Sequence, residues 1–254
     1  MKNIIKHIII RFQESNLPET TTRNTELPVD SNKIISVIGS RRCGKTYLIY
    51  DTIKKIINSG IPKKNILYIN FEDERLQLKT SELDLILQAW RELHNGDELS
   101  NHYFFFDEIQ NINGWEKFIR RIYDNETKNI YITGSNSNFL STEIATSLRG
   151  RSIPFEIFPF SFDEYLRFKS IKTDYYSEKN KAIIINQFNN YLEMGGYPET
   201  IDNDPIRQNE ILRTYYYVML YKDLIERYNI PSAKVIKYFI EKLADNMTKH
   251  FSIN

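Results

Sequence analysis

The strongest constraint on this chain is an octapeptide, GSRRCGKT, at residues 39–46. It fits the pattern G-x-x-x-x-G-K-[ST] at every fixed position. It follows a run of apolar β-forming residues, Ile34–Ile38, and precedes a segment of helical period at 45–58. Glycines at 39 and 44 let the backbone wrap closely, so that successive N–H groups point inward, and the next helix presents its positive N-terminal end to the same anion. The octapeptide therefore predicts a phosphate-binding loop between a strand and a helix.

The residues of this loop have distinct expected roles in holding a nucleoside triphosphate with Mg²⁺. Lys45 is expected to reach the β- and γ-phosphates, and Thr46 to give its hydroxyl to Mg²⁺. Cys43 is interpreted as a small filler; a nucleophilic role is the alternative, but it would also need a neighbouring base. The other expected nucleotide contacts share only their place in the loop or the first helical turn: Gly39, Ser40, Arg41, Arg42, Gly44 and Tyr47.

Further apolar runs alternate with segments of helical period. After the first strand, strand-like runs are found at Ile66–Phe71, Tyr103–Phe106, Ile130–Thr133 and Ile153–Phe158. Helices are expected at 3–13, at 45–58, after Ser81 as N-cap, and after Gly114. Later helices are expected at 161–168, 181–194, 208–228 and 233–246. Five strands alternating with helices predict a parallel α/β sheet.

The strand-like runs stop before Pro159, which divides the chain into two expected regions. Residues 1–159 are expected to form the α/β core, with a helix and a loop in 1–31. Residues 160–254 are expected to form a helical region. The second region opens with Ser161 and Glu164, which are spaced as a capping box.

Composition excludes some classes of protein. There are 34 Lys and Arg against 33 Asp and Glu, so the overall charge does not favour strong sequence-independent attraction to nucleic acid or to membranes. No apolar run reaches the eighteen or so residues of a membrane-spanning helix. The single cysteine excludes an intramolecular disulfide and is typical of a reducing compartment, so we expect a cytoplasmic location.

A second candidate site lies where the run Tyr103–Phe106 ends in Asp107 and Glu108. Two acids at the end of a buried strand are costly without a purpose. Asp107 is expected to hold Mg²⁺ and Glu108 to polarise the attacking water as general base. The alternative is that the acids merely cap a strand at a sheet edge, but their position downstream of a phosphate loop favours the catalytic interpretation.

An acid directly after the Mg²⁺-binding Asp, with an extra strand between the two motifs, resembles the additional-strand, catalytic-glutamate branch of P-loop NTPases. That resemblance implies the strand order 5-1-4-3-2, in which the run Ile130–Thr133 points at the γ-phosphate. One of Thr133, Ser135 and Asn136 is then expected to sense the γ-phosphate or the attacking water, and Ser135 is assigned to the catalytic set. The alternative is a turn at Gly134 capped by hydroxyls.

Two arginines, Arg149 and Arg151, flank Gly150 just before the last strand-like run. A guanidinium beside the γ-phosphate stabilises the charge of the transition state, so each is a candidate arginine finger or sensor. Arg151 is favoured because it leads directly into the strand. Ordinary surface arginines are the alternative, and the sequence leaves open whether a finger acts within the chain or in a neighbouring subunit of a homo-oligomer.

The chain as a whole resembles the archaeal and bacterial AAA-type ATPases of the STAND-related group, in which a P-loop core precedes a helical lid and a winged helix. The matching segments are GSRRCGKT (39–46), FFFDEIQ (104–110), YITGSNS (131–137), LSTEIATSLRGRSIPFEIFPFSFDEYL (140–166), YLEMGGYPE (191–199) and LYKDLIERYNI (220–230). The resemblance implies ATP binding and slow hydrolysis. It also implies that the winged helix begins near 242–254 and is mostly absent from this chain.

The leading hypothesis is a Mg²⁺-dependent ATPase that couples its nucleotide state to a conformational change. The alternative is a non-catalytic or very slow ATP-dependent switch or scaffold, associated with DNA or with a protein through the missing C-terminal domain. ATP is favoured over GTP because no N-K-x-D base reader is evident. Tyr215–Tyr217 with Tyr221 could form a stacking platform for single strands, but they fall on a predicted helix, and packing against the core is favoured.

Overall fold

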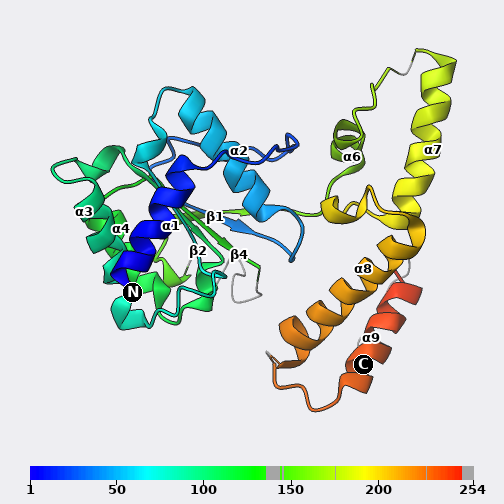
Figure 1. Ribbon diagram of the computed structural model, residues 1–254. Coiled ribbons are helices and arrows are strands. Elements are labelled where there is room, and N and C mark those ends of the chain that lie inside the picture. The colour runs from blue at the N-terminus through cyan, green and yellow to red at the C-terminus, as the bar shows by residue number, and fades with distance from the viewer. Residues whose placement is uncertain (136–143, 145, 175, 227, 248–254) are drawn as a thin grey trace. The chain divides into compact units, whose positions relative to one another are not determined.

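The computed structural model describes residues 1–135, 144, 146–174, 176–226 and 228–247. Contacts divide the chain into two compact units, Met1–Pro198 and Glu199–Asn254. The first contains the sheet, and the described part of the second is helical (Figure 1). None of the helices in the described residues is long and apolar enough to cross a membrane.

The sheet has five parallel strands in the order β2-β3-β4-β1-β5. Read from the other edge, this is the expected order 5-1-4-3-2, so the predicted α/β fold and topology are confirmed. The strands are β1 (Ile34–Ile38), β2 (Ile66–Asn70), β3 (Tyr103–Asp107), β4 (Ile130–Gly134) and β5 (Ser152–Glu156).

Strand β5 differs most from its prediction, because it begins one residue earlier than expected and ends two residues earlier. It pairs only with β1 and forms an edge of the sheet, where its residues are half-buried or exposed. An edge position also explains how Pro154 is accommodated, since proline has no backbone N–H to donate and an edge strand has no ladder on its outer side. An edge strand lacks the uninterrupted apolar run of a central strand, so its bounds are harder to read from sequence.

The first unit places helices on both faces of the sheet (Figure 1). Alternate residues of β1 face opposite ways: Ile34 and Ile38 join one apolar cluster, and Ile35 and Val37 join the other. Helices α1 (Lys2–Glu14), α3 (Asp84–Leu93) and α4 (Trp115–Asn125) pack in the first cluster, and α2 (Lys45–Asn58) packs in the second. Two further helices, α6 (Phe162–Phe168) and α7 (Glu178–Met194), follow the sheet.

Helix α3 does not begin at the expected N-cap, Ser81. Residues Thr80–Glu82 form a 3₁₀ turn, in which a Glu82 carboxylate oxygen accepts a hydrogen bond of 2.9 Å from the Lys79 backbone N–H. The α-helix starts only at Asp84 and has no side-chain cap. By contrast, α6 begins as predicted, with Ser161 and Glu164 forming a capping box.

The described part of the second unit contains α8 (Pro205–Val218), a π-helical segment (Met219–Glu226) and α9 (Ala233–Asp245). Helix α8 starts three residues before the expected position. The Asp204 carboxylate caps it by accepting from the N–H groups of Ile206 and Arg207, both at 3.1 Å, and Pro205 occupies the first helical position.

The division between the compact units lies at Pro198, later than the expected domain boundary at Pro159. The strands do end at Glu156, but the segment that follows is tied to residues of the first unit. Arg23 forms a buried ion pair with Glu164 at 2.8 Å, and Arg167 Nη1 donates to the Thr22 carbonyl at 2.6 Å. Secondary structure alone does not reveal these tertiary contacts.

The Arg23–Glu164 pair is expected to make stability depend on pH. Burial alone would raise the pKa of Glu164, but hydrogen bonds from Arg23 and from two backbone N–H groups outweigh it and lower the pKa below the usual 4.5. The folded protein therefore binds fewer protons at this carboxyl than the unfolded chain does. The resulting stability is present above about pH 4.5 and is lost as the pH falls through the folded pKa.

Urea unfolding measured as a function of pH checks this expectation. The free energy of unfolding of the wild type should fall more steeply below about pH 4.5 than that of Glu164→Gln, which has no proton to bind at this position. Parallel curves for the two proteins would show that Glu164 contributes nothing to the acid sensitivity.

Candidate functional site

The loop between β1 and α2 depends on glycine at two positions. Gly39 and Gly44 both have positive φ angles, 154° and 103°. A Cβ atom at Gly39 would lie 2.3 Å from the carbonyl oxygen of Ile157, and one at Gly44 would lie 3.0 Å from Nη1 of Arg23. The backbone clash at Gly39 and the positive φ at both positions therefore favour glycine at these two places in the predicted loop.

Lys45 turns its ammonium back over this loop. Its Nζ donates to the carbonyls of Gly39 (3.2 Å) and Ser40 (3.0 Å), and the residue is only 4% exposed. The same Nζ lies 3.5 Å from Oε1 of Glu108. The fold thus brings together the loop lysine and the second acid of the β3 motif, which the sequence separates widely.

Asp107, at the end of β3, is 1% exposed and is surrounded by hydroxyl donors. Thr46 donates to its Oδ2 at 2.8 Å, Tyr68 donates to the same oxygen at 2.9 Å, and Thr133 donates to Oδ1. Burial raises the pKa of Asp107 above its usual value, although the three hydroxyl bonds act in the opposite direction. Thr46 and Asp107 together offer the hard oxygen ligands that Mg²⁺ prefers.

Glu108 has a left-handed backbone, with φ 53°, which is a strained conformation for a residue that carries a Cβ. Its Oε2 accepts hydrogen bonds from Ser135 Oγ (2.7 Å), Ser135 N (3.2 Å) and Gln110 Nε2 (2.5 Å). Burial alone would raise the pKa of Glu108, but the Lys45 charge and the bonds from Ser135 and Gln110 outweigh it and lower the pKa below its usual value. The carboxylate is therefore held in its ionised form.

The end of β4 supplies the polar residues between the two motifs, because β4 lies between β1 and β3. Thr133 accepts a hydrogen bond of 2.9 Å from the Glu108 N–H and donates to Asp107, so it contacts both acids. Ser135 contacts Glu108. Asn136, the third candidate sensor, lies outside the described residues.

A comparison with known protein families identifies the family to which this chain belongs. A family model described as an AAA domain matches residues 31–166, which include the loop, both acids and all five strands. The chain belongs to this AAA family.

Relatives of this AAA chain occur in archaea and bacteria. A Methanocaldococcus jannaschii protein named only as uncharacterized is 40% identical over 97% of this chain and 54% of its own length. A protein of Haemophilus influenzae with the same description is 30% identical over 86% of this chain and 52% of its own length. A second M. jannaschii protein is 25% identical over 85% and 48%. The chain thus spans about half the length of the curated relatives it matches.

Among solved structures, similarity extends to PCH-2 of C. elegans, with a TM-score of 0.46 and 14% identity over 86% of this chain and 67% of that chain. It also extends to AMPPCP-bound DnaA from Aquifex aeolicus, with a TM-score of 0.41 and 12% identity over 99% of this chain and 69% of that chain.

The two candidate arginines of the AAA core do not approach the loop within one chain. The carbonyl of Arg151 accepts a hydrogen bond of 2.9 Å from the N–H of Ile34, the first residue of β1, and its guanidinium pairs with Asp124 at 3.1 and 3.2 Å. The phosphate loop instead follows Ile38, the last residue of β1, about 13 Å away along the strand. In a parallel sheet, a residue that precedes one strand lies at the opposite edge from a loop that follows another. Arg149 and Arg151 precede β5, so they lie at the opposite edge of the sheet from the phosphate loop. This position argues against a site role for either arginine in the same chain.

The other residues expected to contact the nucleotide differ in burial and in their contacts. Cys43 is buried, and burial raises the pKa of its thiol, so its environment disfavours a nucleophilic thiolate. Arg42 has a positive φ of 57°, and Nη1 of Arg41 lies 3.5 Å from a carboxylate oxygen of Glu72. Tyr47 is 55% exposed.

Sequence reasoning missed three residues of this site. Tyr68 is an internal residue of β2 and lies in no motif; Gln110, in the turn after β3, ends the segment FFFDEIQ but was given no role. Arg23 comes from the polar segment before β1 and donates to the Cys43 carbonyl at 3.0 Å. A hydroxyl within the apolar run Ile66–Ile69 was the available signal for Tyr68.

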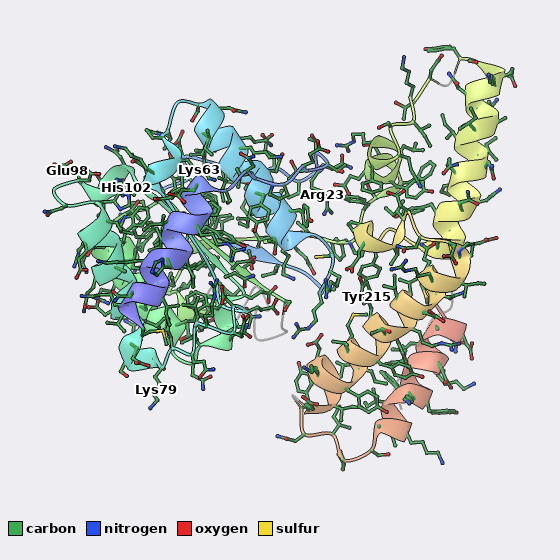
Figure 2. The ribbon with its side chains drawn as sticks, in the orientation of Figure 1. Arg23, Lys63, Lys79, Glu98, His102 and Tyr215 are labelled. Atoms are coloured by element: carbon green, nitrogen blue, oxygen red, sulfur yellow. The ribbon has the colours of Figure 1, made fainter. Side chains whose placement is uncertain are left out.

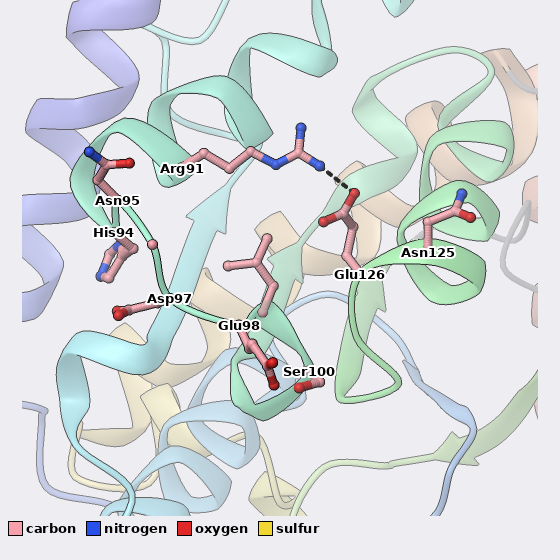
Figure 3. Close-up of a pocket in the computed structure, with 10 residues that line it drawn as sticks. Arg91, His94, Asn95, Asp97, Glu98, Ser100, Asn125 and Glu126 are labelled. Carbon is pink, nitrogen blue, oxygen red and sulfur yellow. Dashed lines mark hydrogen bonds and ion pairs between the residues drawn. The ribbon is translucent and has the colours of Figure 1, made fainter.

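An open pocket elsewhere in the AAA core is distinct from this site (Figure 3). Its lining comes from the segments that precede β3 and β4, including Arg91, Glu98, Ser100 and Glu126, and an Arg91–Glu126 ion pair of 2.5 Å spans it. It therefore lies at the amino edge of the sheet. The loop and both acids lie at the carboxyl edge, where open α/β sheets bind their ligands.

The tyrosines of the second unit form contacts of their own. The rings of Tyr216 and Tyr217 have centroids 5.6 Å apart, and Lys237 Nζ lies 5.3 Å from the Tyr217 ring and 5.5 Å from the Tyr221 ring. Tyr217 and Tyr221 remain 43% and 39% exposed. The cluster therefore packs on helices rather than on a sheet face, where single-strand platforms are usually found.

Proposed function

We propose that this AAA chain binds ATP with Mg²⁺ at residues 39–46 and hydrolyses its γ-phosphate anhydride slowly. The observation that carries the proposal is the convergence of Lys45, Asp107 and Glu108 at one edge of the sheet, with Lys45 Nζ 3.5 Å from Glu108. A buried cation beside a loop that needs two glycines suits a triphosphate, because backbone N–H groups and the ammonium can then neutralise it together.

The residues present fit Mg²⁺. Thr46 Oγ1 and Asp107 Oδ2 lie 2.8 Å apart, and both are oxygen ligands at the mouth of the loop. When bound, Mg²⁺ would neutralise charge on the phosphates. Thr133 and Tyr68, which both donate to the Asp107 carboxylate, would fix its orientation.

Glu108 suits the role of general base. Its lowered pKa keeps the carboxylate ionised, so that it can accept a proton from an attacking water. Ser135, which donates to Glu108 at 2.7 Å, is proposed to orient that carboxylate or to contact the γ-phosphate. A nucleotide role for Arg149 or Arg151 is proposed only through a neighbouring copy, because both lie near the amino edge of their own sheet.

Calorimetric titration with ATP tests the proposal. We expect saturable heat in the presence of Mg²⁺, weaker binding with excess EDTA, and weaker competition by GTP than by ADP. Absence of heat with folded protein and Mg²⁺ would overturn the assignment. Equal affinity with and without Mg²⁺ would remove Thr46 and Asp107 from the metal site.

The finer expectations stay predictions. They are the STAND relationship, a winged helix beyond this chain, a nucleotide-driven conformational change, a DNA or protein partner, a homo-oligomer and a cytoplasmic location. Because the chain spans about half of its relatives' length, the activity of a whole protein of that length is also a proposal.

A further inference from the structure

Arg23, which Figure 2 labels, donates hydrogen bonds to three separate segments at once. Its Nη1 donates to the Cys43 carbonyl at 3.0 Å, its Nη2 donates to the Phe158 carbonyl at 2.6 Å, and its Nε donates to Glu164 at 2.8 Å. Its guanidinium carbon also lies 4.9 Å from the centre of the Phe160 ring. One side chain thus joins the phosphate loop, the exit of β5 and helix α6.

The bond to Cys43 constrains the next peptide group. Peptide planes are rigid, and in a trans peptide the C=O and the following N–H point in opposite directions. None of the peptide bonds among the described residues is cis. When Arg23 holds the Cys43 carbonyl, the Gly44 N–H must therefore point away from Arg23. Gly44 precedes α2, so this N–H belongs to the set that would face a bound phosphate.

The constraint is firm because Arg23 is itself anchored. The side chains of Arg23 and Glu164 are only 6% and 5% exposed, unlike a surface ion pair, which contributes little. Glu164 is fixed in turn by the N–H groups of Asn24 (2.7 Å) and Ser161 (2.8 Å). Glycine lacks a Cβ and is conformationally free, so the Cys43–Gly44 peptide needs such an external support to stay in one orientation.

We propose that Arg23 is a positioning residue that fixes the Gly44 N–H for phosphate binding and makes its orientation depend on helix α6 through Glu164. The inference rests on the proposed ATP site, which it deepens by naming how the loop is held ready. Arg23 is not proposed to contact phosphate itself, because its Nε, Nη1 and Nη2 each already donate to a protein acceptor.

Calorimetric titration of folded variants with Mg²⁺–ATP and with inorganic tripolyphosphate tests the proposal. Arg23→Gln and Glu164→Gln should each raise the Kd for both ligands about tenfold, the cost expected when a preorganised group must be ordered on binding. The double variant Arg23→Gln/Glu164→Gln leaves no unpaired buried charge and should show the same loss. Arg121→Gln, which removes an exposed pair with Asp84, should bind like wild type.

Two further variants separate positioning from lost stability. Arg23→Lys keeps a charge beside Glu164 but has one ammonium in place of a fork, so it should regain stability without regaining affinity. Ile122→Val, in the core on α4, shows how far lost stability alone changes the Kd. Wild-type affinity in the double variant, or an equal loss in Ile122→Val, would overturn the positioning role while leaving the ATP site intact. Failure of the wild type to bind either ligand would overturn both.

Discussion

Replacing Lys45 with alanine is expected to raise the Kd for Mg²⁺–ATP by about a hundredfold or more. The Lys45 ammonium lies against the loop, with its Nζ 3.0 Å from the Ser40 carbonyl oxygen, and the residue is almost fully buried. Charge-assisted hydrogen bonds to phosphate are the strong ones, and a loss of about 3 kcal/mol corresponds to about a hundredfold in affinity. Calorimetric titration of the folded variant measures the change.

Lys54→Ala is the matched control, because Lys54 lies on the same helix and donates to Thr20 at 3.1 Å, away from the loop. Its affinity should equal that of wild type. Lys45→Ala also removes the cation 3.5 Å from Glu108, so circular dichroism must first show that it is folded. Equal ATP affinity in folded Lys45→Ala and wild type would contradict the site assignment.

The central part of the fold could be predicted because its information is local and redundant. The first strand and its helix matched their observed bounds, 34–38 and 45–58, since an apolar run, two glycines and a helical stripe all indicate the same boundaries. Prediction from sequence was less accurate where a tertiary contact determines the bounds of an element. The edge strand β5 carries a mixed burial pattern, and Ser81 lost its capping role to a turn closed by Glu82.

The candidate site, too, could be predicted in part and not in full. Lys45, Asp107 and Glu108 could be assigned from two short motifs, and the strand order then brought Thr133 to both acids. Arg23 could not be found, because its role depends on contacts with residues 20 and 141 positions away in sequence. The sequence also left open whether Arg151 acts within its own chain; the direction of β5 places it at the edge of the sheet opposite the loop, so its nucleotide role stays a prediction for a neighbouring copy.

Glu108→Gln is expected to lower ATP turnover by roughly 10²- to 10⁴-fold, the usual contribution of a general base, while ATP affinity stays within a few-fold of wild type. The amide keeps the size of the side chain and one oxygen acceptor for the hydroxyl of Ser135, which donates to Glu108 at 2.7 Å. It cannot accept a proton at neutral pH. Release of inorganic phosphate at saturating ATP measures turnover, and calorimetry measures affinity.

Glu92→Gln, on α3, removes an exposed carboxylate and should leave both quantities unchanged. Lys45→Ala and Glu108→Gln probe different steps, since Lys45 serves binding and Glu108 serves the transfer of a proton from water. Turnover equal to wild type in Glu108→Gln would exclude Glu108 as the base and leave the binding site standing. Loss of affinity equal to that of Lys45→Ala would instead mean that Glu108 acts by holding the loop lysine, 3.5 Å away, in place.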